Sequence, residues 1–208
     1  QTVIAELASV PGAFGLEEAI NSYTRAYLKN HSEKELKEHY YTFPGIDAGN
    51  REAQALLRIA LITVFEEKSK KADKEENPDD KRLADAMVGV LFRDLKNEFQ
   101  PKQLTNYVLV RVGDYLREKT GTPRAALPYY NEVVGREDQS YRFNANFGLA
   151  DILGGSASPA EKLKAVQSLE HVFKNAPQKK QQERALFRIV EILTEKGDWG
   201  DVTTRAKE

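Results

Sequence analysis

The chain has 208 residues, of which 40% are hydrophobic, so it is long enough to bury one sizeable core and a wholly disordered protein is excluded. Its 31 basic and 32 acidic side chains nearly cancel, so no bulk electric field draws it to nucleic acid or to an anionic membrane. The lack of cysteine excludes disulfides and thiolate sites, and it fits a reducing cytoplasm as well as a bacterial envelope.

No apolar stretch reaches the roughly 18 to 20 residues that a membrane-spanning helix needs. The nearest is Leu56 to Phe65, which Arg58 interrupts, so we expect no direct membrane insertion. The chain starts at Gln1 rather than at a methionine and stops at Glu208 within an expected helix. We therefore expect it to be a piece of a longer protein.

Apolar residues recur at spacings of three and four along the whole chain, and alternation with a period of two is nearly absent. This pattern predicts an all-α protein without strands, with about ten helices of roughly 12 to 22 residues. Breaks are expected at Pro11-Gly12, Pro44-Gly45, Asn77-Pro78, Gln100-Pro101, Gly121 to Pro123, Gly154 to Pro159, Ala176-Pro177 and Gly197. Helices joined by such short connections are expected to pack as antiparallel hairpins.

Three of these breaks carry the residues that start helices. Asn77, Thr122 and Ser158 each stand directly before a proline. Proline suits the first position of a helix, and the polar side chain before it can accept a hydrogen bond from the first turn. We therefore expect the hydroxyls of Thr122 and Ser158 to cap helices. After Asn77, the carboxylates of Asp79 and Asp80 favour a helix start through the helix dipole.

Similar small and large residues return in successive hairpins of the second half. Leu109, Val112, Gly113 and Leu116 lie along one helix face, and Ala125 and Tyr129 follow after a turn. The small side chains predict a close approach of two helices, with Tyr129 filling the space beyond. The next two hairpins contribute Phe147-Gly148, Ala165, Leu169, Val172 and Pro177, and then Ile189, Leu193 and Gly197-Asp198-Trp199.

These residues resemble the tetratricopeptide repeat family, whose unit of about 34 residues is a helical hairpin with this spacing. The resemblance implies a right-handed solenoid of antiparallel hairpins, as a single domain over 1–208. Recognisable repeats cover 106–208, and irregular ones cover 1–105. Inside the matched part, the connection from Gly154 to Pro159 is longer than the family pattern, and Glu132 stands where a small residue is usual.

The resemblance also implies where a ligand would bind. In that family the first helix of each hairpin lines a concave groove, and its positions outside the packing pattern meet the ligand. On this chain those positions are Tyr107, Arg111, Asp114, Arg142, Asn146, Arg184, Arg188 and Glu191. Arginine suits carboxylates and tyrosine offers rigid contact area, so the expected partner is a protein or peptide, with an acidic or C-terminal segment.

One branch of the family clamps the terminal carboxylate of a peptide with Lys and Asn side chains. Asn146 and Arg188 match that clamp, and Arg184 is a basic replacement at a third position. Val110 and Asp114 stand where the clamp has Lys and Asn, and a carboxylate there would repel the carboxylate to be bound. The alternative for every arginine is an ion pair with a neighbouring acid on a solvated surface, which contributes less than about 1 kcal/mol.

Signs of catalysis and of metal binding are weak. Glu35 and His39 share a helix face, but no further metal ligand converges on them, so we expect no metal and no cofactor. The chain has neither a phosphate-binding loop nor the Gly-x-Ser-x-Gly elbow of serine hydrolases. The aromatic cluster His39 to Phe43 is interpreted as packing, with a stacking platform for a sugar or base as the alternative.

We therefore expect a non-catalytic scaffold that binds another protein or a peptide, and not an enzyme. By analogy with degenerate helical repeats, a periplasmic or envelope location in a bacterium is slightly favoured over the cytoplasm. Two alternatives stay open. The chain could be the helical accessory domain of a larger enzyme, for example one acting on the cell wall, or a self-assembling array that forms homo-oligomers.

Overall fold

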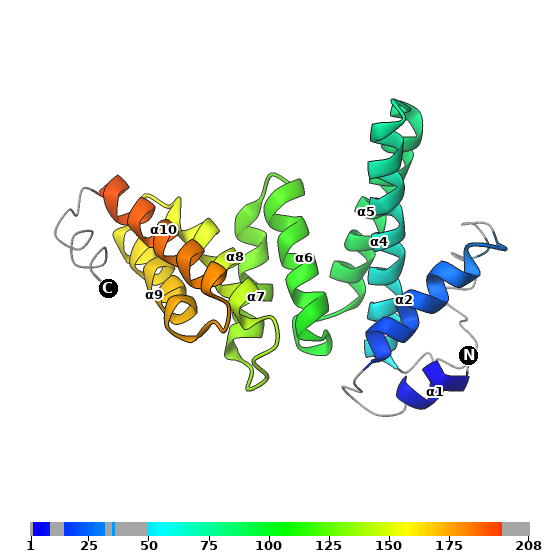
Figure 1. The fold of residues 1–208 in the computed structure, drawn as a ribbon, viewed down its shortest axis with the longest axis horizontal. Coiled ribbons are helices and arrows are strands. Elements are labelled where there is room, and N and C mark those ends of the chain that lie inside the picture. Colours follow the sequence, from blue (N-terminus) through cyan, green and yellow to red (C-terminus); the bar gives the residue numbers. More distant parts are fainter. Residues whose placement is uncertain (1, 9–14, 32–34, 36–49, 197–208) are drawn as a thin grey trace. The chain divides into compact units, whose positions relative to one another are not determined.

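The computed structural model describes residues 2–8, 15–31, 35 and 50–196, and every regular element in these ranges is a helix (Figure 1). The all-α prediction is therefore confirmed for the described chain. The chain divides into two compact units, 1–108 and 109–208, and each is described by itself. The predicted breaks near Pro11, Pro44 and Gly197 lie outside the described residues, as do the aromatic cluster His39 to Phe43 and the Gly197-Asp198-Trp199 turn.

The helices end close to the remaining predicted breaks. The first unit contains α1 (Thr2–Ala8), α2 (Leu16–Tyr27), α4 (Arg51–Lys74), α5 (Pro78–Glu98) and the short 3₁₀ helix η1 (Pro101–Gln103). The second contains α6 (Asn106–Lys119), which begins just before the boundary, then the 3₁₀ helix η2 (Pro123–Ala126), α7 (Leu127–Gly135), α8 (Arg142–Gly154), α9 (Pro159–Asn175) and α10 (Lys179–Lys196).

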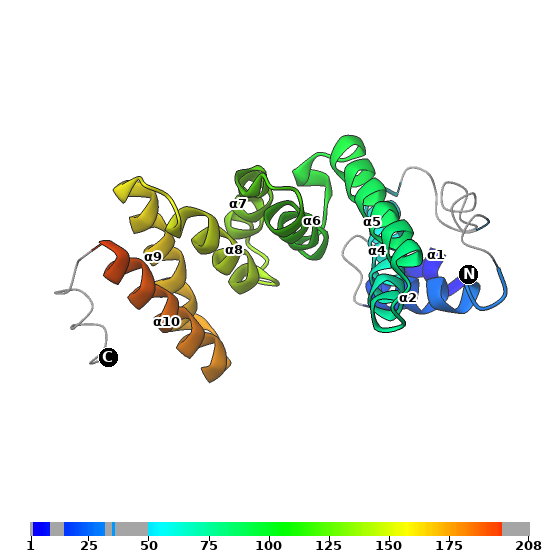
Figure 2. The same ribbon diagram turned by 90° about the horizontal axis from the view of Figure 1, so that it is seen from above.

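The core of the first unit is built around the apolar run of α4 from Ala53 to Phe65, which packs against α2 and α5. Figure 1 and Figure 2 both show α5 beside α4. The single charge in the run, Arg58, is buried, and its guanidinium forms an ion pair with Glu98 and lies 5.0 Å from the centre of the Phe99 ring. Arg58 Nη1 also donates to the carbonyl oxygen of Gln54 at 3.0 Å. The buried charge is therefore paired, as low-dielectric surroundings require.

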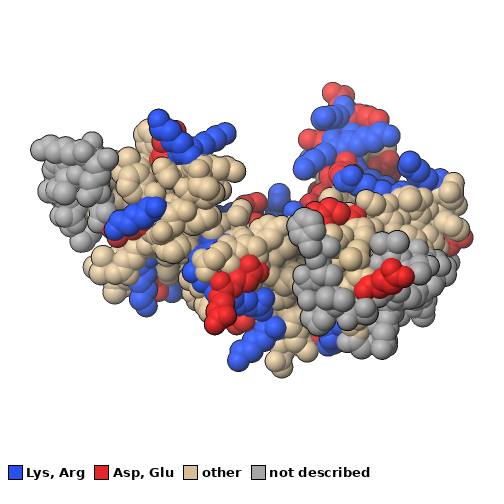
Figure 3. Space-filling model, turned by 60° about the horizontal axis from the view of Figure 1, so that its bottom comes forward, with Lys and Arg blue, Asp and Glu red and all other residues tan. Residues whose placement is uncertain are grey.

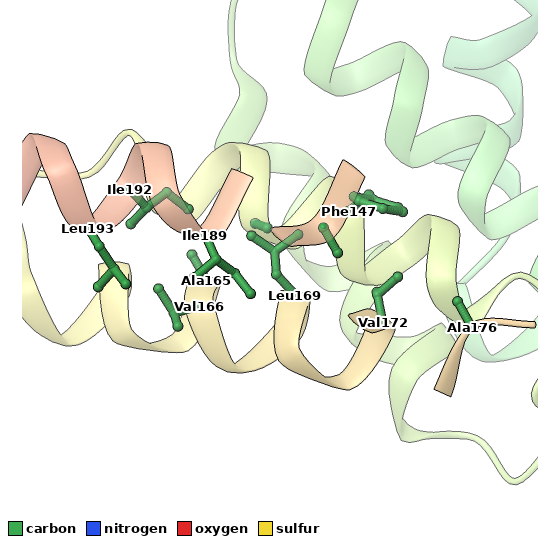
Figure 4. Packing of buried hydrophobic residues seen from close by; sticks show 11 residues of the cluster. Phe147, Ala165, Val166, Leu169, Val172, Ala176, Ile189, Ile192 and Leu193 are labelled. Carbon is green, nitrogen blue, oxygen red and sulfur yellow. The ribbon is translucent and has the colours of Figure 1, made fainter. Parts of the chain in front are cut away.

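The core of the second unit is a cluster of small and branched apolar residues where α8, α9 and α10 meet (Figure 4). Ala165, Leu169 and Val172 of α9 are fully buried, as the repeat pattern predicted. They face Ile189 and other residues of α10, while Phe147 of α8 lies at one end of the cluster. These contacts make α8 with α9, and α9 with α10, neighbouring pairs.

The segment after Gly121 differs from the expectation of one continuous helix. Pro123–Ala126 form a 3₁₀ helix, and the α-helix starts only at Leu127. Pro128 explains the break, because its ring would clash with the carbonyl of Arg124 in a continuous α-helix and it has no N–H to donate. The expectation that Tyr129 fills the space beside Gly113 is wrong, since the ring that touches Gly113 belongs to Tyr130.

The predicted caps at Thr122 and Ser158 are wrong, and a cap is found at Asn77 instead. The Asn77 side chain accepts a hydrogen bond of 3.2 Å from the backbone N–H of Asp80 and so caps α5. Thr122 and Ser158 precede helices with proline in the first turn, but neither side chain makes a capping hydrogen bond. Proline is enough to start both helices, because it fixes φ and removes a donor that would need a partner.

Candidate functional site

Tyr130 of α7 holds α6 and α8 close together. A Cβ atom added to Gly113 of α6 would lie 2.7 Å from Cε1 of the Tyr130 ring, and a Cβ added to Gly148 of α8 would lie closer still. The same ring therefore touches the bare backbone of both helices. Only glycine leaves room for this contact, because any side chain at either position would overlap the ring.

Asp151 of α8 joins the three helices through ion pairs. Its carboxylate pairs with Arg117 of α6, and its Oδ1 lies 3.4 Å from Nε of Arg188 of α10. Arg117 stands 34 positions before Asp151, and Arg188 stands 37 positions after it. The helices α6 and α10 therefore both approach the same side chain of α8.

Two contacts show that α8 and α10 run in the same direction at this place. Arg184 lies over the ring of Phe147 with its guanidinium carbon 4.5 Å from the ring centre. One helical turn further along both helices, Arg188 meets Asp151. Contacts that advance by four residues on both helices require parallel neighbours, because antiparallel helices would advance in opposite directions.

Asp114 of α6 is tied into the same arrangement. Its Oδ1 accepts a hydrogen bond of 2.7 Å from the hydroxyl of Tyr130, and Arg117 Nη2 lies 3.3 Å from the same oxygen. Burial raises the pKa of Asp114, and the hydrogen bond from Tyr130 and the positive charge of Arg117 oppose that rise. Burial, followed by Asp114 itself, raises the pKa of Tyr130, so the phenol stays protonated and donates.

At the other end of this arrangement, Arg188 Nη1 donates to Glu191 at 2.7 Å. The ion-pair row, by which we mean Asp114, Arg117, Asp151, Arg188 and Glu191, thus crosses α6, α8 and α10. It holds three acids and two arginines, so its charges largely compensate one another. For Arg188 the structure shows the ion pairs that the alternative reading anticipated.

The remaining predicted residues of α8 and α10 form a second group, the donor set of Arg142, Asn146 and Arg184. Asn146 is 3% exposed, and its Nδ2 has no hydrogen-bond partner in the described part of the chain. Arg142 donates from Nη2 to the carbonyl oxygen of Arg136, and Arg184 lies over Phe147. Within the described residues, neither arginine pairs with a carboxylate.

The donor set comes from the N-terminal parts of α8 and α10. Arg142 and Asn146 are four residues apart on α8, so they share one helix face. Arg184 contacts Phe147, the residue directly after Asn146. Arg142 is the first residue of α8, whose first turn has neither an acidic residue nor a side-chain cap. The N-terminal turn of a helix adds a partial positive charge to these donors.

Tyr107 and Arg111 complete the predicted set on α6. Both side chains are partly exposed and take part in contacts of their own. Arg111 lies near enough to Asp114 for its charge to oppose the rise of that carboxyl's pKa. Tyr107 stands one turn before Arg111 on the same face of the helix. The structure therefore brings Arg111 near Asp114, and Tyr107 lies one turn away on the same face of α6.

Arg117 and Asp151 were missed by the sequence analysis, although they join the predicted residues to one another. The signal that could have found them is their spacing, since these opposite charges are 34 positions apart, which is about the length of the expected repeat.

Comparison with known families, with curated proteins and with solved structures found no match to this chain. Among the helices described, none is long and apolar enough to cross a membrane. No three acidic or histidine side chains gather in a metal-binding arrangement anywhere in the described ranges. His31 Nδ1 lies 3.9 Å from Glu35, and His39, which was considered together with Glu35 in the sequence, lies outside the described residues.

Proposed function

We propose that this chain is a non-catalytic scaffold that binds an acidic segment of another protein on the face formed by α6, α8 and α10. Its second unit would be a tetratricopeptide-like, right-handed solenoid of antiparallel hairpins, in which these three helices are the first helices of successive repeats. A protein that works in this way needs no reacting group. Its function lies in side chains that the packing leaves for a ligand.

The repeat spacing of the contacts supports the solenoid. Gly113 and Gly148, which touch the same tyrosine, are 35 positions apart, and Arg117 and Asp151 are 34 apart. Units of about 34 residues that stack side by side would place equivalent residues of neighbouring first helices in contact. The parallel course of α8 and α10 is what such stacking requires.

The observation that carries the binding proposal is the buried amide of Asn146 without a partner. A buried polar group that makes no hydrogen bond costs about 1–3 kcal/mol, and native proteins rarely leave one in this state. The unsatisfied atom is a donor, and the two arginines beside it are donors as well. A ligand that satisfies all three must bring hydrogen-bond acceptors and negative charge.

An acidic peptide segment meets this requirement well. A main-chain carbonyl oxygen of the peptide could accept from Asn146, while its carboxylates pair with Arg142 and Arg184. The ion-pair row offers little further attraction, because its arginines already face acids. The ligand is therefore expected to lie over the N-terminal halves of α8 and α10 and to depend on the donor set.

The test measures binding of a fluorescein-labelled, glutamate-rich peptide by fluorescence anisotropy. A matched peptide with lysine in place of every glutamate serves as the ligand control. The double variant Arg142→Glu, Arg184→Glu is expected to bind the acidic peptide at least about tenfold more weakly than the wild type, since charge-assisted hydrogen bonds are worth about 1.5–3 kcal/mol each.

The matched protein control is the double variant Arg82→Glu, Arg93→Glu, which makes the same change of charge at two exposed arginines of α5. It is expected to bind like the wild type. If both double variants weaken binding equally, the effect comes from net charge and the proposed site is ruled out. If the acidic and the basic peptide bind equally well, the proposed preference for an acidic ligand is ruled out.

A further inference from the structure

The end of the α4–α5 hairpin farthest from the core, residues 66–87, has an unusual composition. Figure 3 shows basic and acidic side chains crowded over this end, near the connection between the two helices. The buried side chains there are small, namely Ser69, Ala72 and Ala84. Two such helices bury little apolar surface against each other, so an additional packing partner would stabilise them.

This end of the hairpin carries an open, partly apolar cavity of about 290 Å³. Phe65, Ala72 and Ala84 form its apolar part. Leu83 also lines it and is 62% exposed, which makes it one of the few large apolar side chains that the described chain leaves in water. The apolar part of the cavity and the exposed leucine together form a short apolar strip on this face.

The charges around the strip have a fixed order along the hairpin. Lys68 and Lys71 lie toward the core, and Glu75 and Asp80 lie toward the connection. Two lysines and two acids make this rim neutral overall. A partner of one charge sign would gain little here, whereas a surface with the same two charges in the reverse order would be complementary.

Two contacts fix the register of the hairpin and hence the position of Leu83 within it. Ser69 donates to Asp85 at 2.6 Å, and Lys81 pairs with Asp73. From the first contact to the second, the residue number rises from 69 to 73 on α4 and falls from 85 to 81 on α5. Leu83, midway between 85 and 81, therefore lies level with Lys71, midway between 69 and 73. Leu83 therefore stands between Lys68 on one side and Glu75 on the other.

We propose that this face binds the same face of a second copy of the chain through a two-fold axis that crosses the hairpin at the level of Leu83. Such an axis reverses the direction of the second hairpin, so Lys68 of each copy lies opposite Glu75 of the other. It also places the two Leu83 side chains against each other over the apolar strip. A two-fold contact of this kind needs a self-complementary surface, and the neutral rim supplies one.

The inference is independent of the proposed peptide binding, because it concerns only the first unit. The contact is expected to be weak, since the face is shorter than a standard protein interface. In the wild-type dimer, Lys71 keeps its partner within the chain, where its Nζ lies 3.7 Å from Glu75. Glu75 would then accept from Lys71 of its own copy and from Lys68 of the other.

Sedimentation velocity over a concentration series tests the proposal on the 208-residue chain. The wild type is expected to shift from the monomer mass of 23.5 kDa toward twice that mass as the concentration rises into the upper micromolar range. Leu83→Glu is expected to raise the dissociation constant at least about tenfold, because it places charge at the centre of the contact. Leu163→Glu, at an exposed leucine of α9, should leave the dimer intact.

A charge exchange tests the register. Lys68→Glu and Glu75→Lys should each be monomeric, because like charges would face each other, whereas an equimolar mixture of the two should form dimers again. Circular dichroism of each variant shows that the helices are retained. A wild type that stays monomeric throughout would overturn the proposal and leave the face to another protein. A mixture no more associated than its components would overturn the proposed two-fold contact.

Discussion

The ring of Tyr130 lies so close to Gly148 that a Cβ atom at this glycine would overlap it. Gly148→Ala is therefore expected to destabilise the second unit by about 1–3 kcal/mol, the usual cost of overpacking. The sign of the change in the free energy of unfolding is informative, because alanine in place of glycine within a helix otherwise stabilises the helix by up to about 1 kcal/mol. Chemical denaturation followed by circular dichroism measures the change.

Gly135, the last residue of α7, provides the matched control for this substitution. Nothing lies within 4 Å of a Cβ atom added there, so Gly135→Ala is expected to be neutral or slightly stabilising. Equal effects of the two substitutions would contradict the contact between Tyr130 and the backbone of α8.

The buried amide of Asn146 is expected to lower the stability of the fold and to contribute to peptide binding. Asn146→Leu replaces a buried amide that lacks a partner by an apolar side chain of similar shape, and so removes a cost of about 1–3 kcal/mol. We expect Tm to rise by about 2 °C or more for each kcal/mol gained, while binding of the glutamate-rich peptide falls. A variant that loses stability and binds as the wild type does would show that the amide serves the fold.

The contact between η2 and α9 predicts a pH effect. Hydrogen bonds from Arg124 to Glu161, of 3.1 and 2.5 Å, together with a hydrogen bond from Ser156, lower the pKa of Glu161 from 4.5 to about 2. Because the pKa is lower in the folded state, the stability that this carboxylate contributes is present above about pH 4.5. It is lost as the pH falls toward 2.

The carboxyl resonance of Glu161, followed by NMR during an acid titration, checks this directly. In Arg124→Ala the pKa should return most of the way to its ordinary value, and the loss of stability in acid should become shallower. An unchanged titration of Glu161 in that variant would rule out Arg124 as the main cause.

In the ion pair of buried Arg58 with Glu98, loss of Glu98 is expected to destabilise the fold more than loss of Arg58. Glu98→Ala leaves a buried guanidinium without its carboxylate and should cost roughly 2 kcal/mol, less than for a fully buried pair because Glu98 is 36% exposed. Arg58→Met removes the buried charge and leaves Glu98 in contact with water, so its cost should be smaller. Thermal unfolding of both variants gives the comparison, and the reverse order would contradict this account.

Much of the fold follows from local patterns in the sequence. Leu109, Val112 and Leu116 recur with the helical period, and all three are buried. The failure at Tyr129 lies where the expected continuous helix is interrupted. Four residues of 3₁₀ helix precede the α-helix that starts at Leu127, so positions counted from Ala125 with a single α-helical period no longer apply.

The candidate site was less predictable, because its properties depend on neighbouring helices. Whether Arg188 meets Asp151 or a ligand depends on how α8 lies beside α10, and no local pattern contains that information. The burial of Asn146 is likewise produced by residues distant in the chain. The sequence indicated which helix faces carry polar groups, and the structure separates them into the ion-pair row and the donor set.

The most direct test of the proposed binding face is an NMR titration of the ¹⁵N-labelled chain with the glutamate-rich peptide. If the peptide binds at the donor set, the side-chain NH₂ signals of Asn146 and the Nε–H signals of Arg142 and Arg184 shift during the titration, while the Nε–H signal of Arg117 in the ion-pair row changes little. Binding that leaves the Asn146 NH₂ signals unchanged, or no binding at all, would contradict the proposed binding face.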